Sequence, residues 1–288
     1  MRVLITGGSG HIGQVLGKHL QHKYEVVVFD LVEAEPPLKY LRGDLRVFEQ
    51  VELACADVDI IVHAGAIPYD TGEARKIMEV NVMGTCNVLE AAVMHGVQKV
   101  VFASSASATG MGPFSKELMI PDYFPTDEKQ PCRPEDTYGL SKLLGEELCA
   151  AYTRKYGVRT ICLRLAMVYD PKRPKAMERL KNIVNNPAHG KLFLWACVDV
   201  RDVAQAFQLA LENEVAAHEV YNIGAAQIAA EKPSLELIRT YYPQVPLIDE
   251  RSFIENSHQS LLDISKAKRE LGFEPQYSWR ESLSTPGA

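Results

Sequence analysis

Two residues suited to proton transfer lie four positions apart in the run YGLSK, which begins with Tyr138 and ends with Lys142. On a helix this spacing puts both side chains on one face, where they can reach the same bound molecule. A phenol ordinarily titrates near pH ~10, but a neighbouring ammonium group favours its anion and moves it toward the range of a useful base. A tyrosine and a lysine at this spacing are more often part of a solvated helix face, so the surrounding sequence must decide.

A glycine-rich turn at the start of the chain indicates what that molecule could be. The apolar run RVLIT leads into glycines at positions 7, 10 and 13, and the next apolar run, EVVVF, ends at Asp30. A turn of this kind brings the backbone close to a pyrophosphate and aims a helix N-terminus at its charge. A carboxylate about 20 residues after the middle glycine accepts hydrogen bonds from an adenosine ribose and repels a 2′-phosphate. The pattern predicts a dinucleotide and favours NAD over NADP.

The elements that must position these residues alternate along the first 165 residues. Apolar runs typical of buried strands are RVLIT, EVVVF, DIIVHAG, KVVFASS and RTICLRL, and residues 11–22, 46–54, 72–95 and 136–156 have helical patterns. Strands separated by helices imply a parallel sheet covered on both faces. The fold class predicted is therefore α/β, with a doubly wound parallel sheet over residues 1–165.

The alternation fades after residue 165, which predicts a smaller C-terminal lobe over residues 166–288. Helices are expected near 175–185, 200–212, 234–241 and 263–271, and short strands near 192–195 and 219–222. The boundary is soft, and elements of the two parts can interleave. The stretch from Gly110 to Pro134 contains five prolines, too many for a helix or a central strand, and should form a loop near the site.

Composition favours a small-molecule substrate. The net charge is −6 and no run of Lys or Arg occurs, so the chain lacks the charge pattern of a protein that binds nucleic acid or an anionic membrane surface. Its six cysteines are scattered, without metal-ligand spacing, and we expect no metal site. The first residues enter a strand without an apolar leader, and we expect a cytoplasmic protein.

Several motifs together resemble those of one superfamily. TGGSGHIG resembles the TGxxGxxG of the short-chain dehydrogenases/reductases, and VNVMGT, VFASSAS and YGLSK resemble later motifs of that superfamily. The similarity is to the extended branch, the NAD-dependent epimerase/dehydratase family, and it continues through DVRDVAQA and DISKAKRELGF. It implies a Rossmann fold with a C-terminal substrate lobe, NAD as the cofactor and, by analogy with related enzymes, a homodimer.

The resemblance also implies a role for individual residues. Tyr138 would take the proton from a substrate hydroxyl, Lys142 would hold the nicotinamide ribose, and Ser105 would hydrogen-bond the substrate oxygen. His63 is more typical of a satisfied core or cofactor-lining residue than of a base. Cofactor contacts are expected, besides Tyr138 and Lys142, from Gly7, Gly10, His11, Ile12, Gly13, Asp30, Asp44, Leu45, Ala64, Gly65, Ala66 and Asn81.

Departures from the family pattern bear on the reaction. Sugar-nucleotide 4,6-dehydratases typically have Thr-Asp-Glu at the positions where this chain has Ser105, Ala106 and Ser107. Without an acidic residue at these positions to expel water, dehydration is disfavoured. Epimerases that act on nucleotide sugars carry an Asn at about Met167 and an Arg near Trp195, both in their diphosphate clamp. A nucleotide sugar would therefore need replacement charge, for which Arg173 and Arg251 are the candidates we name.

These departures leave more than one function open. The favoured one is an NAD-dependent sugar or nucleotide-sugar epimerase/oxidoreductase, in which retained NADH returns hydride to the opposite face of the ketone. The alternative is a net dehydrogenase of a free sugar or uronic acid, from which NADH leaves. A regulatory protein that binds NAD without turnover is less favoured, because such proteins typically lose the tyrosine or the lysine that this chain keeps.

Overall fold

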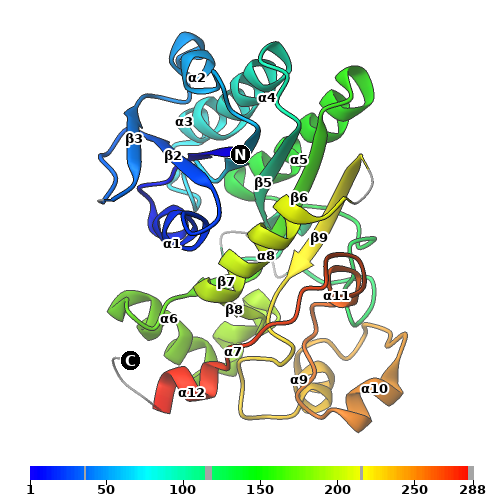
Figure 1. Ribbon diagram of the computed structural model, residues 1–288. Helices are drawn as coiled ribbons and strands as arrows, with labels where there is room; N and C mark the ends of the chain where they lie inside the picture. Colours follow the sequence, from blue (N-terminus) through cyan, green and yellow to red (C-terminus); the bar gives the residue numbers. More distant parts are fainter. Residues whose placement is uncertain (36, 114–118, 215–216, 285–288) are drawn as a thin grey trace.

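The computed structural model describes residues 1–35, 37–113, 119–214 and 217–284 (Figure 1). Residues 114–118 of the predicted proline-rich loop lie outside this range. The rest of that loop, from Gly110 to Pro134, contains neither a long helix nor a strand, as predicted. Its backbone touches the C-terminal part of the chain, because Phe124 N–H donates to Pro246 O and Thr126 N–H to Leu261 O.

The core is a seven-stranded parallel sheet with the strand order β3-β2-β1-β4-β5-β6-β9, which confirms the predicted doubly wound fold. Alternate residues of β1 enter different clusters, with Val3 and Ile5 on one face and Leu4 on the other, as expected of a strand buried on both sides. The strands are β1 (Arg2–Thr6), β2 (Glu25–Asp30), β3 (Lys39–Arg42), β4 (Ile60–His63), β5 (Lys99–Ser105), β6 (Arg159–Leu165) and β9 (His218–Ile223).

Helices cover both faces of this sheet. Helices α1 (His11–Leu20) and α8 (Val200–Glu212) pack together on one face, and α2 (Phe48–Ala54), α4 (Gly84–Met94) and α5 (Thr137–Tyr156) lie on the other. The predicted helix over 72–95 is continuous, formed by α3 (Ala74–Ile77), a π-helical segment, η1 (Met78–Met83), and α4. Length and composition alone would allow this helix to span a membrane, but it packs against α2 and α5 on the sheet.

The C-terminal lobe is built around a pair of parallel strands, β7 (Met167–Tyr169) and β8 (Cys197–Asp199). The strand predicted near 192–195 was wrong. Residues Lys191–Phe193 form a helical turn, and Leu194 and Trp195 follow with φ of 51° each, which places the apolar side chains of both in the lobe core without strand pairing. The lobe helices are α6 (Pro174–Asn185), α7 (Pro187–Gly190), α9 (Ser234–Tyr241), α10 (Glu250–Glu255), α11 (Ser265–Leu271) and α12 (Trp279–Ser284).

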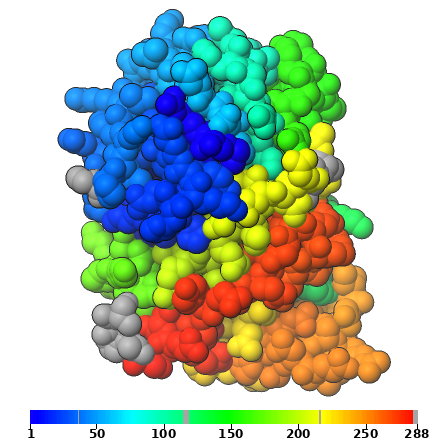
Figure 2. All heavy atoms as spheres, viewed as in Figure 1, coloured from blue at the N-terminus to red at the C-terminus, as the bar shows by residue number. Residues whose placement is uncertain are grey.

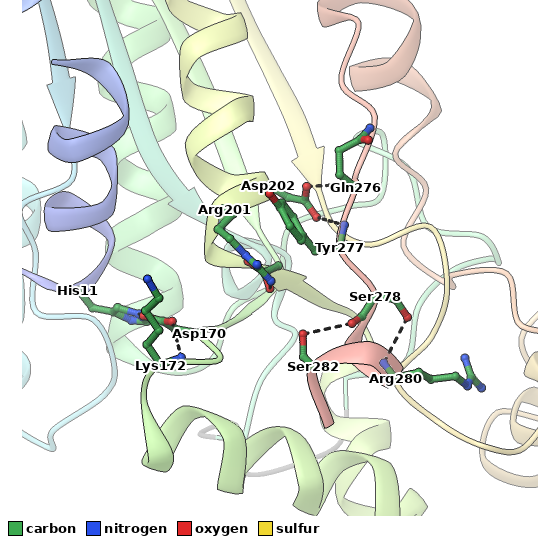
Figure 3. Close-up of polar contacts among 11 residues, drawn as sticks. His11, Asp170, Lys172, Arg201, Asp202, Gln276, Tyr277, Ser278, Arg280 and Ser282 are labelled. Carbon is green, nitrogen blue, oxygen red and sulfur yellow. Dashed lines mark hydrogen bonds and ion pairs between the residues drawn. The ribbon is translucent and has the colours of Figure 1, made fainter. Parts of the chain in front are cut away.

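The two parts of the chain interleave. Strand β9 pairs with β6 as the last strand of the main sheet, and in Figure 2 the yellow residues of this region reach up beside the blue, teal and green ones. Near the C-terminus, the Asp202 carboxylate on α8 accepts from the backbone N–H groups of Gln276 and Tyr277 (Figure 3). The Arg201 guanidinium lies 3.6 Å from the centre of the Tyr277 ring. These contacts hold the segment at residues 276 and 277 against α8, one of the helices that cover the sheet.

Candidate functional site

A cavity of about 1020 Å³ lies at the carboxyl ends of the central strands, where ligands bind in folds of this kind. Two groups of residues line it. We call the first the cofactor half; it comes from the turns after β1, β2, β3 and β4 and includes Gly7, Gly10, His11, Ile12, Gly13, Asp30, Asp44, Leu45, Arg46, Ala64, Gly65 and Ala66. We call the second the substrate half; it comes from the lobe and consists of Met167, Val168, Arg179, His189 and Phe193.

The glycine turn can be built only from glycines at its tightest points. A Cβ on Gly7 would lie 2.5 Å from the Cα of Gly65, and one on Gly13 would lie 2.3 Å from the carbonyl oxygen of Gly7. Helix α1 then begins at His11, and no side chain caps it. The backbone N–H groups of its first turn therefore have no side-chain acceptor. A helix N-terminus in this state suits an anionic pyrophosphate, and the turn fits a dinucleotide.

Asp30 occupies the position expected of a ribose-binding carboxylate. Its Oδ2 accepts from Ser9 N–H at 3.0 Å and its Oδ1 from Val32 N–H at 3.2 Å, which fixes the side chain at the wall of the cavity. Asp44 is engaged instead by Arg46, whose Nη2 lies 2.6 Å from Oδ2, and hydrogen bonds from Arg46 lower the Asp44 pKa. Arg46 also lines the cavity and was not identified from the sequence.

His63 is locked in place behind the turn. The Thr85 hydroxyl donates to Asn81 O and therefore accepts from His63 Nε2–H at 2.9 Å, which leaves His63 Nδ1 to accept from the Thr6 hydroxyl at 2.6 Å. Burial lowers the His63 pKa to about 3, with a further contribution from the charge of Lys142. His63 is therefore a neutral structural residue, in line with the interpretation drawn from its strand end.

Asn81 lies behind the cavity wall and is not among the residues that line it. Its side chain is occupied by the protein: Oδ1 accepts from Ile67 N–H, and Nδ2 donates to Ile67 O and to the hydroxyl of Ser141. These bonds tie the π-helical segment to the segment after β4 and to α5. Its contribution to a bound cofactor would be to hold Ala66 and Ile67 in place.

Ser105, Tyr138 and Lys142 line the same cavity and lie close to one another. Ser105 ends β5, and its hydroxyl is hydrogen-bonded to the phenol of Tyr138. Lys142, one turn further along α5, donates from Nζ to Ala103 O at 2.7 Å and lies 5.8 Å from the centre of the Tyr138 ring. The predicted sharing of one helix face is confirmed by this geometry.

Burial dominates the titration of this pair. It raises the Tyr138 pKa to about 12, opposed by the hydrogen bond from Ser105 and reinforced by the charge of Asp136. It lowers the Lys142 pKa to about 8, opposed by the charge of Glu146. The charge of an oxidised nicotinamide, on which the expected lowering of the Tyr138 pKa also depends, does not enter these values; in the protein alone the phenol is neutral near pH 7.

A buried ion pair between Glu146 and Arg164 lies next to these residues and was not identified from the sequence. The Glu146 carboxylate accepts from the Ser104 hydroxyl at 2.5 Å and from Arg164 Nη2 at 2.7 Å. Glu146 lies on α5 one turn after Lys142, whereas Ser104 and Arg164 lie on β5 and β6. The spacing of Tyr138, Lys142 and Glu146 at four-residue intervals was a signal that could have revealed the pair.

Neither arginine proposed for substrate charge lines the cavity in the described structure. Arg251 lies on α10, with its side chain 86% exposed and paired with Glu255. Arg173 precedes α6 and contacts Asp170 and Gln14 beside the first turn of α1. Arg179, on α6, lines the substrate half instead. Trp195 is fully buried against Tyr241 and Tyr242, well inside the lobe core.

The sequence and the fold of this chain are similar to those of known proteins. The model of the NAD dependent epimerase/dehydratase family matches residues 3–224. A UDP-glucose 4-epimerase of Corynebacterium glutamicum is 26% identical over 96% of this chain and 92% of its own length. A uronate dehydrogenase of Pseudomonas syringae is 29% identical over 61% of this chain and 62% of its own length.

Among solved structures, the UDP-glucose 4-epimerase of Thermus thermophilus in complex with NAD is similar, with a TM-score of 0.71 and 25% identity. The similarity covers 99% of this chain and 97% of that one. NAD is the cofactor in the description of the matching family, which confirms the cofactor predicted from the glycine turn and Asp30.

Proposed function

Because the chain belongs to the NAD-dependent epimerase/dehydratase family, we propose that it removes hydride from a carbinol carbon of a sugar-type substrate, with Tyr138 as the base. The observation that carries the proposal is the clustering of Ser105, Tyr138 and Lys142 in the wall of the one cavity that the cofactor half and the substrate half also line.

Each of the three residues has a distinct task in this reaction. Bound NAD⁺ supplies the hydride acceptor and a positively charged ring. Tyr138 takes the proton of the substrate hydroxyl, and Ser105 donates to the substrate oxygen as negative charge develops there. The Lys142 ammonium stabilises the phenolate that forms, which offsets the burial that raises the Tyr138 pKa. The charge of Glu146 raises the Lys142 pKa and so favours the ammonium form.

Epimerisation is the reaction course we favour, because the UDP-glucose 4-epimerases cited above match this chain over nearly its whole length. In that course the hydride returns to the opposite face of the ketone and NADH does not accumulate. Dehydration is disfavoured, because the carboxylates that line the described cavity, Asp30 and Asp44, both lie in the cofactor half. The described substrate half contains no carboxylic acid to expel water.

A specific observation favours the second candidate, a net dehydrogenase of a free sugar acid. The substrate half contains Arg179 and His189, and Phe193 packs edge-on against His189 with 5.7 Å between ring centres. These groups suit a single carboxylate and a pyranose ring better than a nucleoside diphosphate. The buried position of Trp195 also leaves the diphosphate clamp of epimerases without its arginine.

The experiment that separates the two courses uses the purified protein with a panel of sugars, uronic acids and nucleotide sugars. NADH absorbance and the stereochemistry of the product are followed together. Inversion without net NADH identifies an epimerase, and stoichiometric NADH identifies a dehydrogenase. A protein that binds NAD but neither inverts nor oxidises any member of the panel would contradict the proposal and favour the regulatory alternative.

We further propose a homodimer formed through α4 and α5. Large apolar side chains are exposed on α4, on α5 and at the end of η1, among them Met94 at 61%, Leu144 at 37% and Met83 at 54%. A second copy would bury them in a four-helix arrangement. We expect sedimentation to give twice the mass of the chain and the variant Leu144→Glu to give the monomer; a monomeric wild type would contradict this proposal.

A further inference from the structure

A contact between distant parts of the chain spans the edge of the cofactor half. Nε2 of His11 lies 3.0 Å from Oδ2 of Asp170, although the two residues are 159 positions apart (Figure 3). His11 is the first residue of α1 and lines the cavity. Asp170 directly follows β7, the strand that begins the lobe. The contact therefore joins the glycine turn to the lobe.

The segment after β7 surrounds this contact with charge. Asp170 Oδ1 accepts from Lys172 N–H at 2.9 Å, and Arg173 Nε lies 3.8 Å from Asp170 Oδ2. Arg173 Nη2 also donates to Gln14 Oε1 at 3.4 Å, which makes a second link to the first turn of α1. The groups that face His11 are thus one carboxylate, the Arg173 guanidinium and the positive end of α1.

His11 stands between two anionic positions. Nε2 of its imidazole contacts Asp170, and His11 itself begins the uncapped first turn of α1, which lines the cavity where a cofactor diphosphate fits. Within the described residues Nδ1 has no hydrogen-bond partner, whereas Nε2 has Asp170. A neutral imidazole can donate through one nitrogen only, but an imidazolium donates through both. Only the protonated ring can therefore serve both anions.

We propose that His11 and Asp170 form a clasp for the cofactor diphosphate in which the imidazole of His11 takes up a proton from solvent when NAD binds. The proposal rests on the NAD-dependent function argued above. In the free chain burial lowers the His11 pKa, and this outweighs the hydrogen bond that His11 donates to Asp170, while Arg173 lowers the pKa further. The ring is therefore neutral at neutral pH until the diphosphate adds its negative charge, which raises the pKa.

Proton uptake is measured by titrating NAD⁺ into the ligand-free protein in a calorimeter, at pH 7.5, in buffers of different ionisation enthalpy. We expect uptake of most of a proton per site by the wild type and close to none by His11→Gln. Uptake should also vanish in the wild type at a pH well below the free-state pKa of His11, where the ring is already charged. His19→Gln is the matched control, because His19 lies on the same helix and contacts Gln208, away from the cavity.

Release of the cofactor gives a second measurement. In stopped-flow fluorescence, NADH should leave His11→Gln about tenfold faster than the wild type, the effect of one lost charge-assisted hydrogen bond. Asp170→Asn, which keeps an acceptor oxygen without the charge, should show reduced proton uptake. Equal proton uptake by His11→Gln and the wild type, or NAD binding by the wild type with no uptake at pH 7.5, would overturn the clasp. Absence of NAD binding at any pH would instead contradict the cofactor assignment itself.

Discussion

The two halves of the cavity are built in different ways. The cofactor half is shaped by backbone at the ends of β1, β2 and β4, with Gly7, Gly13 and Gly65 so close together that no side chain fits between them. The substrate half is shaped by side chains of the lobe, such as Met167, Arg179 and His189. Where backbone forms the wall, few residue types are possible; where side chains form it, many are.

The halves also differ in how firmly their polar groups are held. In the cofactor half, Asp30 accepts from two backbone N–H groups, and behind it His63 is fixed between two threonine hydroxyls. In the substrate half, Arg179 is an exposed residue at the start of the lobe. The first half is organised before any ligand arrives, whereas the second can adapt to the ligand it receives.

The largest effect on activity should come from Tyr138, which lines the cavity that both halves share. Tyr138→Phe removes the acid/base hydroxyl and little else, so we expect hydride transfer to fall about a thousandfold while NAD affinity is unchanged. Rates are measured by single-turnover NADH absorbance and affinity by calorimetry. Tyr152→Phe is the control on the same helix, since its hydroxyl donates to Glu90 away from the cavity. Wild-type turnover in Tyr138→Phe would contradict the mechanism.

The rigidity of the cofactor half is tested by Gly13→Ala. The new Cβ would lie within 2.3 Å of Gly7 O and 2.5 Å of Gly8 Cα, so the turn must open. We expect NAD affinity to fall about a hundredfold, the weakening expected when several backbone contacts to an anion are lost together. Gly10→Ala, whose Cβ would be 3.1 Å from Gly7 O, should lose much less. Equal losses in the two variants would show that backbone closeness does not govern this half.

Cofactor choice should depend on one charge in the same half. Asp30→Ala removes the carboxylate expected to face the 2′ position, and we expect the ratio of NAD to NADP affinity to fall about tenfold or more. Glu33→Ala is a control, because Glu33 is exposed nearby and does not line the cavity. An unchanged ratio in Asp30→Ala would count against the ribose assignment.

The smallest effect should come from the substrate half. Arg179→Met should raise KM for a uronic acid about tenfold, with kcat and the KM of a neutral sugar unchanged, because only binding to the carboxylate is lost. Lys181→Met, on the same helix but not at the cavity, should behave as the wild type. If both substrates were affected alike, Arg179 would not be the group that selects the anion.

The difference between a wall formed by backbone and a wall formed by side chains also explains what could be predicted from the sequence. The strands and the glycine turn follow from apolar runs and from positions that admit only glycine. Strand β3 has no apolar run, because it is an edge strand with the sequence KYLR and is largely exposed. The apolar run LFLW was mistaken for a strand, because burial in a helical turn and burial in a sheet require the same residue types.

Side-chain placement in the lobe was harder to predict for a related reason. Arg173, Arg179 and Arg251 have the same chemistry and lie in similarly polar stretches, and only the packing of α6 brings one of them to the cavity. Strand β9 was expected as a short strand near 219–222, but its position beside β6 depends on long-range pairing that no local pattern encodes. Because β9 pairs with β6, the C-terminal part of the chain interleaves with the first 165 residues, as the sequence allowed.

The place of β9 beside β6 also affects how the chain can fold during synthesis. When residue 165 leaves the ribosome, the first six strands of the sheet exist, but the edge of β6 has no neighbour until residues 166–217 have followed. An uncovered parallel edge is prone to association with other chains. A fragment that stops at residue 165 should therefore aggregate, and the lobe is needed to complete the nucleotide-binding sheet as well as to hold the substrate.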